Sequence, residues 1–177
     1  MTSKKYPHPF GQVAKRYRKF RRELTTVASN IALNEFEGNF GRNGSGGYRD
    51  DAGKFVAWEP RKVETTRTGR RVKTSRRSIL VRSGRLKRSF KRTPTFTKAR
   101  VINTAPYASI HNEGGLIKGT VTVREHTRKG GSKVRQHTRK VNTEMPKRPF
   151  MEGNKAINDE INSHINNELE DIFKDLP

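Results

Sequence analysis

The stretch FGQVAKRYRKFRRELTTVASNIALNEF, residues 10–36, decides the fold, because its large apolar side chains recur mostly at steps of three and four residues. Such spacing places side chains on one face of a helix. The positions are Phe10, Val13, Tyr17, Phe20, Leu24, Val27 and Ile31, with Phe36 beyond them. The Lys and Arg residues between 15 and 22 fall mostly elsewhere around the helix. We therefore expect one long amphipathic helix over most of the first 40 residues, with its apolar stripe in the core.

The end of the chain predicts a second helix. Its apolar positions, spaced by four, four, four and three residues, are Ile157, Ile161, Ile165, Leu169 and Ile172. The remaining surface of this helix is acidic, because residues 152–177 hold seven Asp or Glu against two Lys. The apolar stripe predicts packing against the rest of the domain.

Short strands and one helical turn are expected between the two helices. Residues 78–82 and 100–103 have the apolar and β-branched character of strands, and Pro94 between them favours an irregular or edge strand. Residues 107–112 are typical of a helical turn that Gly114 and Gly115 would end. The order predicts an α+β fold: long N-terminal and C-terminal helices packed on a small, mostly antiparallel sheet, in one domain over residues 1–177.

An imperfect repeat predicts a protruding basic β-hairpin over residues 118–141. VREHTRK at 123–129 recurs as VRQHTRK at 134–140, with Gly130-Gly131-Ser132 between them. A two-residue loop at Gly130-Gly131 would pair His126 with Arg135. A three-residue loop would change every pairing, so the sequence leaves the register open.

Two further segments are expected to be loops. Residues 38–53 contain six glycines, whose spacing fits neither G-x-x-x-x-G-K-[ST] nor a strand–GxGxxG–helix unit, the two phosphate-binding motifs. Residues 61–77 are densely basic with few large apolar groups. Trp58, the only tryptophan, is expected to anchor the end of the glycine-rich segment on the core.

The charge limits the classes of protein to consider. The 39 Lys and Arg residues outnumber the 17 Asp and Glu residues and give a formal net charge of +22. Leu, Ile, Val and Phe make up only about one fifth of the chain, so we expect a small core. No apolar run approaches the roughly 18 residues of a membrane span. Without cysteine, neither a disulfide nor a cysteine-based zinc site can form.

The charge must be offset by something that the protein meets, and we expect DNA, acidic partner proteins or both. Residues 60–100 carry sixteen Lys or Arg and one acid, and residues 118–148 carry ten and two. The acidic end therefore contrasts with a basic remainder. This asymmetry suits head-to-tail contact between copies and, equally, a contact within one chain.

The sequence predicts no enzyme, and we expect no catalytic residue, metal or cofactor. His126 and His137 are flanked by Arg and Lys, which disfavours a bound cation. His111 and Glu113 are two residues apart, and such residues do not share a helix face. Nucleic-acid binding is the stronger class on charge alone, although no common nucleic-acid-binding module fits.

Three blocks of the chain resemble the tailed-phage virion morphogenesis family, whose members are also called tail completion or neck proteins, and in particular its Mu-like type. The blocks are ILVRSGRLKRSF at 79–90, VINTAPYASIHNEGG at 101–115 and MPKRPFM at 145–151, in the family's order. The matching residues are Leu80, Ser83, Gly84, Leu86 and Ser89, then Tyr107, Ala108, His111 and Gly114, then Pro146, Arg148, Pro149 and Phe150, with Trp58 where the family often has a tryptophan. We expect these residues to maintain the fold.

The resemblance implies a structural virion protein of the head–tail junction, located in the neck after assembly in the host cytoplasm. It implies a ring of copies, for which we expect a hexamer, and no catalysis. The implied partners are portal or adaptor, tail terminator or tail tube proteins, with packaged DNA in the channel as a further contact and no membrane.

Two basic segments depart from the family pattern, so their roles are not inherited from it. In these segments we expect the following residues to face partners or DNA: Arg70, Arg71, Arg76, Arg77, Arg124, Arg128, Lys133, Arg135, Arg139 and Lys140. The alternative function is that of a basic protein of ribosomal or histone-like type, which binds nucleic acid without sequence specificity.

Overall fold

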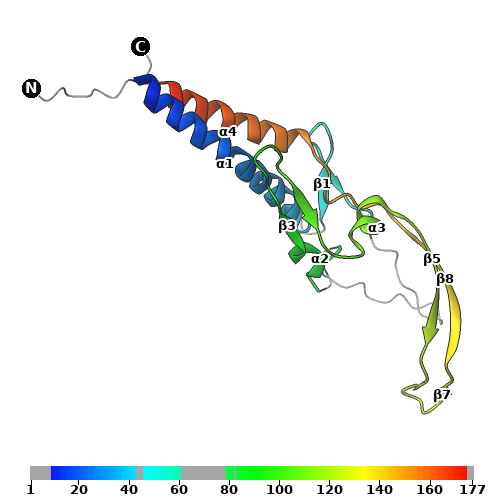
Figure 1. Ribbon diagram of the computed structural model, residues 1–177. Coiled ribbons are helices and arrows are strands. Elements are labelled where there is room, and N and C mark those ends of the chain that lie inside the picture. The colour runs from blue at the N-terminus through cyan, green and yellow to red at the C-terminus, as the bar shows by residue number, and fades with distance from the viewer. Residues whose placement is uncertain (1–8, 43–45, 61–78, 82, 175–177) are drawn as a thin grey trace, which may run out of the picture. The chain divides into compact units, whose positions relative to one another are not determined.

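The computed structural model describes residues 9–42, 46–60, 79–81 and 83–174. Its helices are α1 (Pro9–Gly38), α2 (Arg85–Arg88), α3 (Ala108–Glu113) and α4 (Lys155–Phe173). Its strands are β1 (Gly47–Arg49), β2 (Phe55–Ala57), β3 (Phe90–Arg92), β4 (Val101–Asn103), β5 (Gly115–Val123), β6 (His126–Thr127), β7 (Lys133–Val134) and β8 (His137–Met145). This mixture of helices and antiparallel strands confirms the α+β class (Figure 1).

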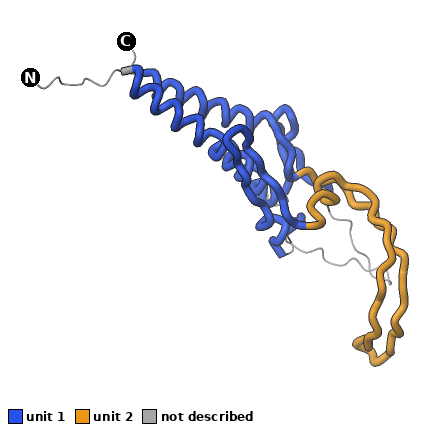
Figure 2. Tube along the Cα trace, viewed as in Figure 1, with its two compact units in different colours: residues 1–105, 150–177 blue, residues 106–149 orange. Residues whose placement is uncertain are grey.

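The strands form separate antiparallel pairs. In the described residues these pairs are β1–β2, β3–β4, β5–β8 and β6–β7. The chain contains two compact units: residues 1–105 with 150–177, and residues 106–149 (Figure 2).

In the first unit, α1 and α4 lie side by side and antiparallel (Figure 1). Phe20 lies 6.4 Å from His164 between ring centroids, whereas Ile31 and Phe36 pack with Ile157 at the other end of the pair. The apolar periodicity of both segments thus predicted which residues of each helix are packed, although not that the two helices pack on each other. One part of the prediction is wrong: Phe10 and Tyr17 are exposed, because this end of α1 has only α4 beside it in the described structure.

Asn154 fixes the start of α4. Its side-chain oxygen accepts a hydrogen bond from the backbone N–H of Ile157 at 3.0 Å, which satisfies one of the free donors at a helix start. Four residues earlier the chain is still core, because Phe150 is fully buried. The third family block therefore leads directly into the capped helix.

The glycine-rich segment 38–53 is not a loop throughout. Its residues Gly47–Arg49 form β1, which pairs with Phe55–Ala57. A Cβ built on Gly47 would lie 2.5 Å from the Phe55 ring, so the glycine leaves the room that this ring occupies. The loop prediction failed because glycine is read as a breaker, whereas here it admits a large neighbour.

The strand expected over 78–82 is absent at its described residues. Ile79 and Leu80 lie in a turn, and the φ of Leu80 is +63°, which a strand cannot accommodate. The apolar character of this run reflects the burial of Ile79 and not strand pairing. The strand expected at 100–103 is confirmed as β4, which pairs with β3.

The second unit consists of α3 and a long two-stranded ribbon. The helical turn expected near 107–112 is confirmed, and it ends at Gly114, whose φ is +74°. A Cβ on Gly114 would also lie 2.7 Å from the backbone nitrogen of Lys147. Glycine is therefore required both by the turn and by the close approach of the third family block.

The hairpin is confirmed, but the two-residue loop is wrong. His126 pairs with Val134 and Thr127 with Lys133, so every pairing differs by one residue from that of the two-residue loop. The N–H of Arg128 donates to the Ser132 carbonyl at 3.0 Å, and the N–H of Gly131 donates to the Arg128 carbonyl at 2.9 Å. With Gly131 at a φ of +81°, this is a three-residue loop with a left-handed residue at its end.

Candidate interaction surfaces

An aromatic cluster joins the first and third family blocks in the first unit. The Phe40 ring lies 5.7 Å from Trp58, 6.0 Å from Phe90 and 5.3 Å from Phe150, measured between centroids. Trp58 is 3% exposed, which confirms its expected role as an anchor. These edge-to-face and tilted contacts bury the aromatic area that such a small core needs. Leu86 of the first block is also buried.

Backbone geometry accounts for the polar members of the first block. Gly84 adopts a φ of +70°, and a Cβ there would lie 2.8 Å from the Arg88 guanidinium. The Ser83 hydroxyl accepts from the Arg85 N–H at 3.4 Å, and the Ser89 hydroxyl donates to the Arg85 carbonyl at 2.6 Å. The block therefore closes one helical turn before β3.

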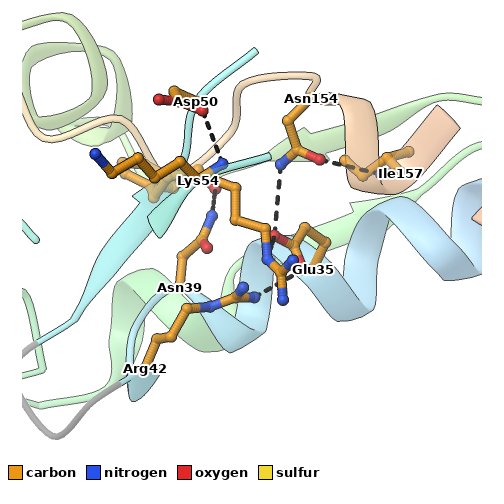
Figure 3. A network of polar contacts seen from close by, with 9 residues as sticks. Glu35, Asn39, Arg42, Asp50, Lys54, Asn154 and Ile157 are labelled. Carbon is orange, nitrogen blue, oxygen red and sulfur yellow. Dashed lines mark hydrogen bonds and ion pairs between the residues drawn. The ribbon is translucent and has the colours of Figure 1, made fainter. Parts of the chain in front are cut away.

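A polar network links the end of α1, the β1–β2 hairpin and the start of α4 (Figure 3). The Glu35 carboxylate is 2.7 Å from the Arg42 guanidinium and 3.4 Å from that of Arg49. The Asn154 side-chain amide donates to Glu35 at 3.4 Å. Asn39 donates to the Phe150 carbonyl at 3.4 Å. This network sets where α4 begins and hence which way its acidic side chains point.

Residues of the second and third family blocks contact each other in the second unit. The Tyr107 and His111 rings meet edge to face at 5.7 Å. The Arg148 N–H donates to the His111 carbonyl at 3.0 Å. Burial, and then the positive charge of Arg148, lower the pKa of His111. Arg148 itself is buried.

Most apolar side chains of the ribbon formed by β5 and β8 lie on one of its faces, and the exception is Leu116, which is 49% exposed on the other. Directly paired residues share a face, and successive pairs alternate between faces. The pairs Ile117–Thr143, Gly119–Val141, Val121–Arg139 and Val123–His137 therefore lie on one side, together with Met145. We call this side the apolar face. Ile117 is 37% and Val121 is 45% exposed.

The opposite side of the ribbon is mostly polar, and we call it the polar face. Its residues are Leu116, Lys118, Thr120, Thr122, Thr138, Lys140, Asn142 and Glu144. The expected partner-facing residues of the ribbon are all exposed: Arg124, Arg128, Lys133, Arg135, Arg139 and Lys140. They do not share one face, since Arg139 and Lys140 lie on opposite sides. The remaining four, Arg70, Arg71, Arg76 and Arg77, lie outside the described residues.

Two contacts could not be found from sequence. The Arg21 guanidinium lies over the Phe96 ring, 5.4 Å from its centroid, although the residues are far apart in the chain. Glu35 with its two arginines likewise joins separate segments. The one available signal was the position of Glu35 beside the apolar stripe of the long helix, where a carboxylate needs a partner.

Nothing in the described part of the chain suggests metal or membrane chemistry. The residues with coordinates contain no group of three or more His, Cys, Asp or Glu side chains that could hold a metal ion. None of the described helices is both long enough and apolar enough to cross a bilayer.

Comparison with protein families identifies a match. Residues 49–170 match the model of the phage virion morphogenesis family, and this span includes the whole β5–β8 ribbon and most of α4 but not α1. The curated proteins gave no match to this chain. The solved structures likewise gave none.

Proposed function

The chain belongs to the phage virion morphogenesis family, and on that premise we propose that it is a structural protein of the phage head–tail junction. Family membership gives it a role in building the virion. The finer proposal is a Mu-like tail completion or neck protein that assembles as a ring, with a hexamer as the expected form. The ring helps to join the tail to the capsid.

The observation that carries this proposal is the exposed β5–β8 ribbon. A two-stranded ribbon is at best marginally stable alone in water, and this one exposes Ile117 and Val121 on one face. Clustered exposed apolar side chains are typical of a protein-binding surface. The ribbon therefore acts as an arm that binds a neighbouring protein of the junction through its apolar face.

The basic side chains of the ribbon select the partner. Residues 115–145 carry eight Lys or Arg and two Glu, so the fitting partner surface is acidic around an apolar strip. Portal, adaptor, tail terminator and tail tube proteins are the candidates. Packaged DNA is a further contact for the arginines near the tip. Both kinds of contact weaken as salt is raised.

The proposal assigns no chemistry to the family residues. Trp58 and Phe150 fill the core, His111 packs against Tyr107, and Gly114 allows a close backbone approach. Each residue is explained by packing or backbone conformation. A structural role without catalysis therefore needs no further property of these residues than their packing and backbone conformation.

A shortened ribbon tests the arm. Lys118 and Asn142 are a directly paired position, so replacing residues 119–141 with Asn-Gly closes the hairpin by a two-residue turn. We expect phage with this variant to accumulate separate heads and tails. Normal tail joining by the shortened protein would refute the role of the ribbon.

A matched pair of substitutions separates protein binding from DNA binding. Val121→Asp places a carboxylate on the apolar face, and Thr120→Asp places the same charge on the polar face one residue away. A protein contact through the apolar face predicts loss of tail joining for V121D and little effect for T120D. Equal loss for both, together with weakened duplex binding, would favour the nucleic-acid-binding alternative.

A further inference from the structure

The first unit carries a basic surface that neither segment of sequence forms alone. The contact between Arg21 and Phe96 holds the turn between β3 and β4 against the middle of α1. This contact joins the arginines of the helix to the basic residues of the turn. We call the joint surface the basic platform; its residues are Arg18, Arg21, Arg22, Lys98 and Arg100, all exposed.

The charge of the platform is not balanced by nearby acids. Among the described residues, no ion pair involves Arg18, Arg22, Lys98 or Arg100. Clustered cations repel one another and attract an anionic surface. Phe96, which is 59% exposed at the centre of this group, adds an apolar contact point.

The same unit carries the complementary charge on α4. Between Lys155 and Phe173 the helix has five Asp or Glu and one Lys. Asp159 forms an ion pair with Lys155 at 2.7 Å, whereas Glu160 and Glu170 are exposed and have no ion pair within the described structure. Asp171 also forms an ion pair, with Lys174, so the uncompensated negative charge of α4 in the described structure is that of acids such as Glu160 and Glu170.

Two arginines of the platform face away from α4 within one molecule. At about 100° per residue, Arg18 and Arg22 lie roughly 160° around α1 from Phe20, which contacts α4 through His164. Although α1 and α4 pack together, Arg18 and Arg22 therefore point away from α4. Opposite charges on different sides of one rigid unit favour contact between copies.

We infer that α4 of one copy binds the basic platform of the next copy, head to tail. This inference rests on the proposed ring and names its subunit contact. The contact is heterologous, so it repeats from copy to copy and closes into a ring or continues as a filament. Duplex DNA would also suit a basic surface, and the test below distinguishes it from a second copy of the chain.

Two charge-reversed chains test the inference. The first chain, Arg18→Glu/Arg22→Glu, reverses two charges of the platform. The second, Glu160→Lys/Glu170→Lys, reverses two charges of α4. The full-length proteins are compared by light scattering and electron microscopy at low salt. A control chain, Lys54→Glu/Arg85→Glu, has the same change in net charge as the platform variant at exposed residues outside both surfaces.

We expect the wild type and the control to assemble, and each reversed chain alone to associate about a hundredfold or more weakly, because like charges then face each other. An equal mixture of the two reversed chains should assemble again, since each interface then joins opposite charges.

Assembly by either reversed chain alone, or failure of the mixture to assemble while both chains keep their wild-type thermal unfolding, would overturn the inference. A wild type that stays monomeric would also overturn it, whereas detection of the protein at the neck of virions would leave the proposed function standing. If R18E/R22E abolished duplex binding and the mixture of reversed chains failed to assemble, the platform would be assigned to DNA instead.

Discussion

Removing the Phe150 side chain is expected to cost the first unit a large part of its stability. Phe150 is fully buried and its ring lies 5.3 Å from Phe40 and 6.1 Å from Phe90. Phe150→Ala therefore opens a cavity at the centre of the aromatic cluster. Such truncations lower the free energy of unfolding by about 3–5 kcal/mol. In a chain of this length, that loss lowers the Tm by roughly 6–20 °C.

The assay uses Trp58, the only tryptophan, as its reporter. Its ring packs on Phe40, so its fluorescence follows the unfolding of this cluster in urea and on heating. Phe96→Ala is the matched control, because Phe96 is 59% exposed and its contact with Arg21 is worth only about 0.5–1 kcal/mol. If F150A lost no more stability than F96A, the central position of the aromatic cluster in the fold would be refuted.

Three further predictions concern backbone geometry, titration and capping. Gly114→Ala should lower the free energy of unfolding by about 1–3 kcal/mol, because it adds a Cβ at positive φ against backbone, whereas Gly130→Ala, with open space around it, should cost less than 1 kcal/mol in the same denaturant titration. Because the pKa of His111 is lowered in the folded chain, the unfolded chain binds the proton more readily, so stability should fall as the pH drops below about 6.5. Tm values between pH 7.5 and 5 should show this slope, and His111→Gln should flatten it; an unchanged slope in the variant would contradict the assignment to His111. Asn154→Ala should lower the free energy of unfolding by about 0.5–2 kcal/mol through loss of the helix cap. Asn154→Asp should restore only part of that loss, because its carboxylate faces Glu35. Full recovery in chemical denaturation would contradict that arrangement.

Periodicity alone was enough to predict the two long helices, but not that they pack against each other. The steps of three and four residues in both terminal segments reflect packing of one helix face, and they located α1 and α4 correctly. Periodicity did not show how far the stripe is covered. Phe10 and Tyr17 follow the same pattern as Phe20, yet they are exposed, because coverage depends on which other elements reach that end of the helix.

Local sequence could not decide the turns. The repeat predicted the hairpin, but the choice of a three-residue loop depends on the left-handed conformation of Gly131, and glycines permit both alternatives. The difference of one residue changes which residues share a face of the ribbon. Leu80 likewise lies in an apolar run, yet it adopts a positive φ, which leucine rarely does, so the local sequence did not indicate this turn.

The resemblance to the family predicted more of the residues of the site than the composition did. Its blocks predicted that Trp58, Tyr107, His111 and Phe150 maintain the fold, and the structure places them in packed contacts. Contacts between segments remained hidden, as with Arg21 and Phe96. Such pairs depend on tertiary arrangement, for which neither spacing nor charge gives a signal.

The position of the protein in the virion is the most direct test of the proposed function. Cryo-electron microscopy of intact virions, compared with particles that carry the shortened ribbon, would locate it. We predict a ring of copies between capsid and tail, with the β5–β8 ribbon of each copy against an adjacent ring of the junction. Virions in which the protein is absent from the junction, or bound only along the packaged DNA, would contradict the account.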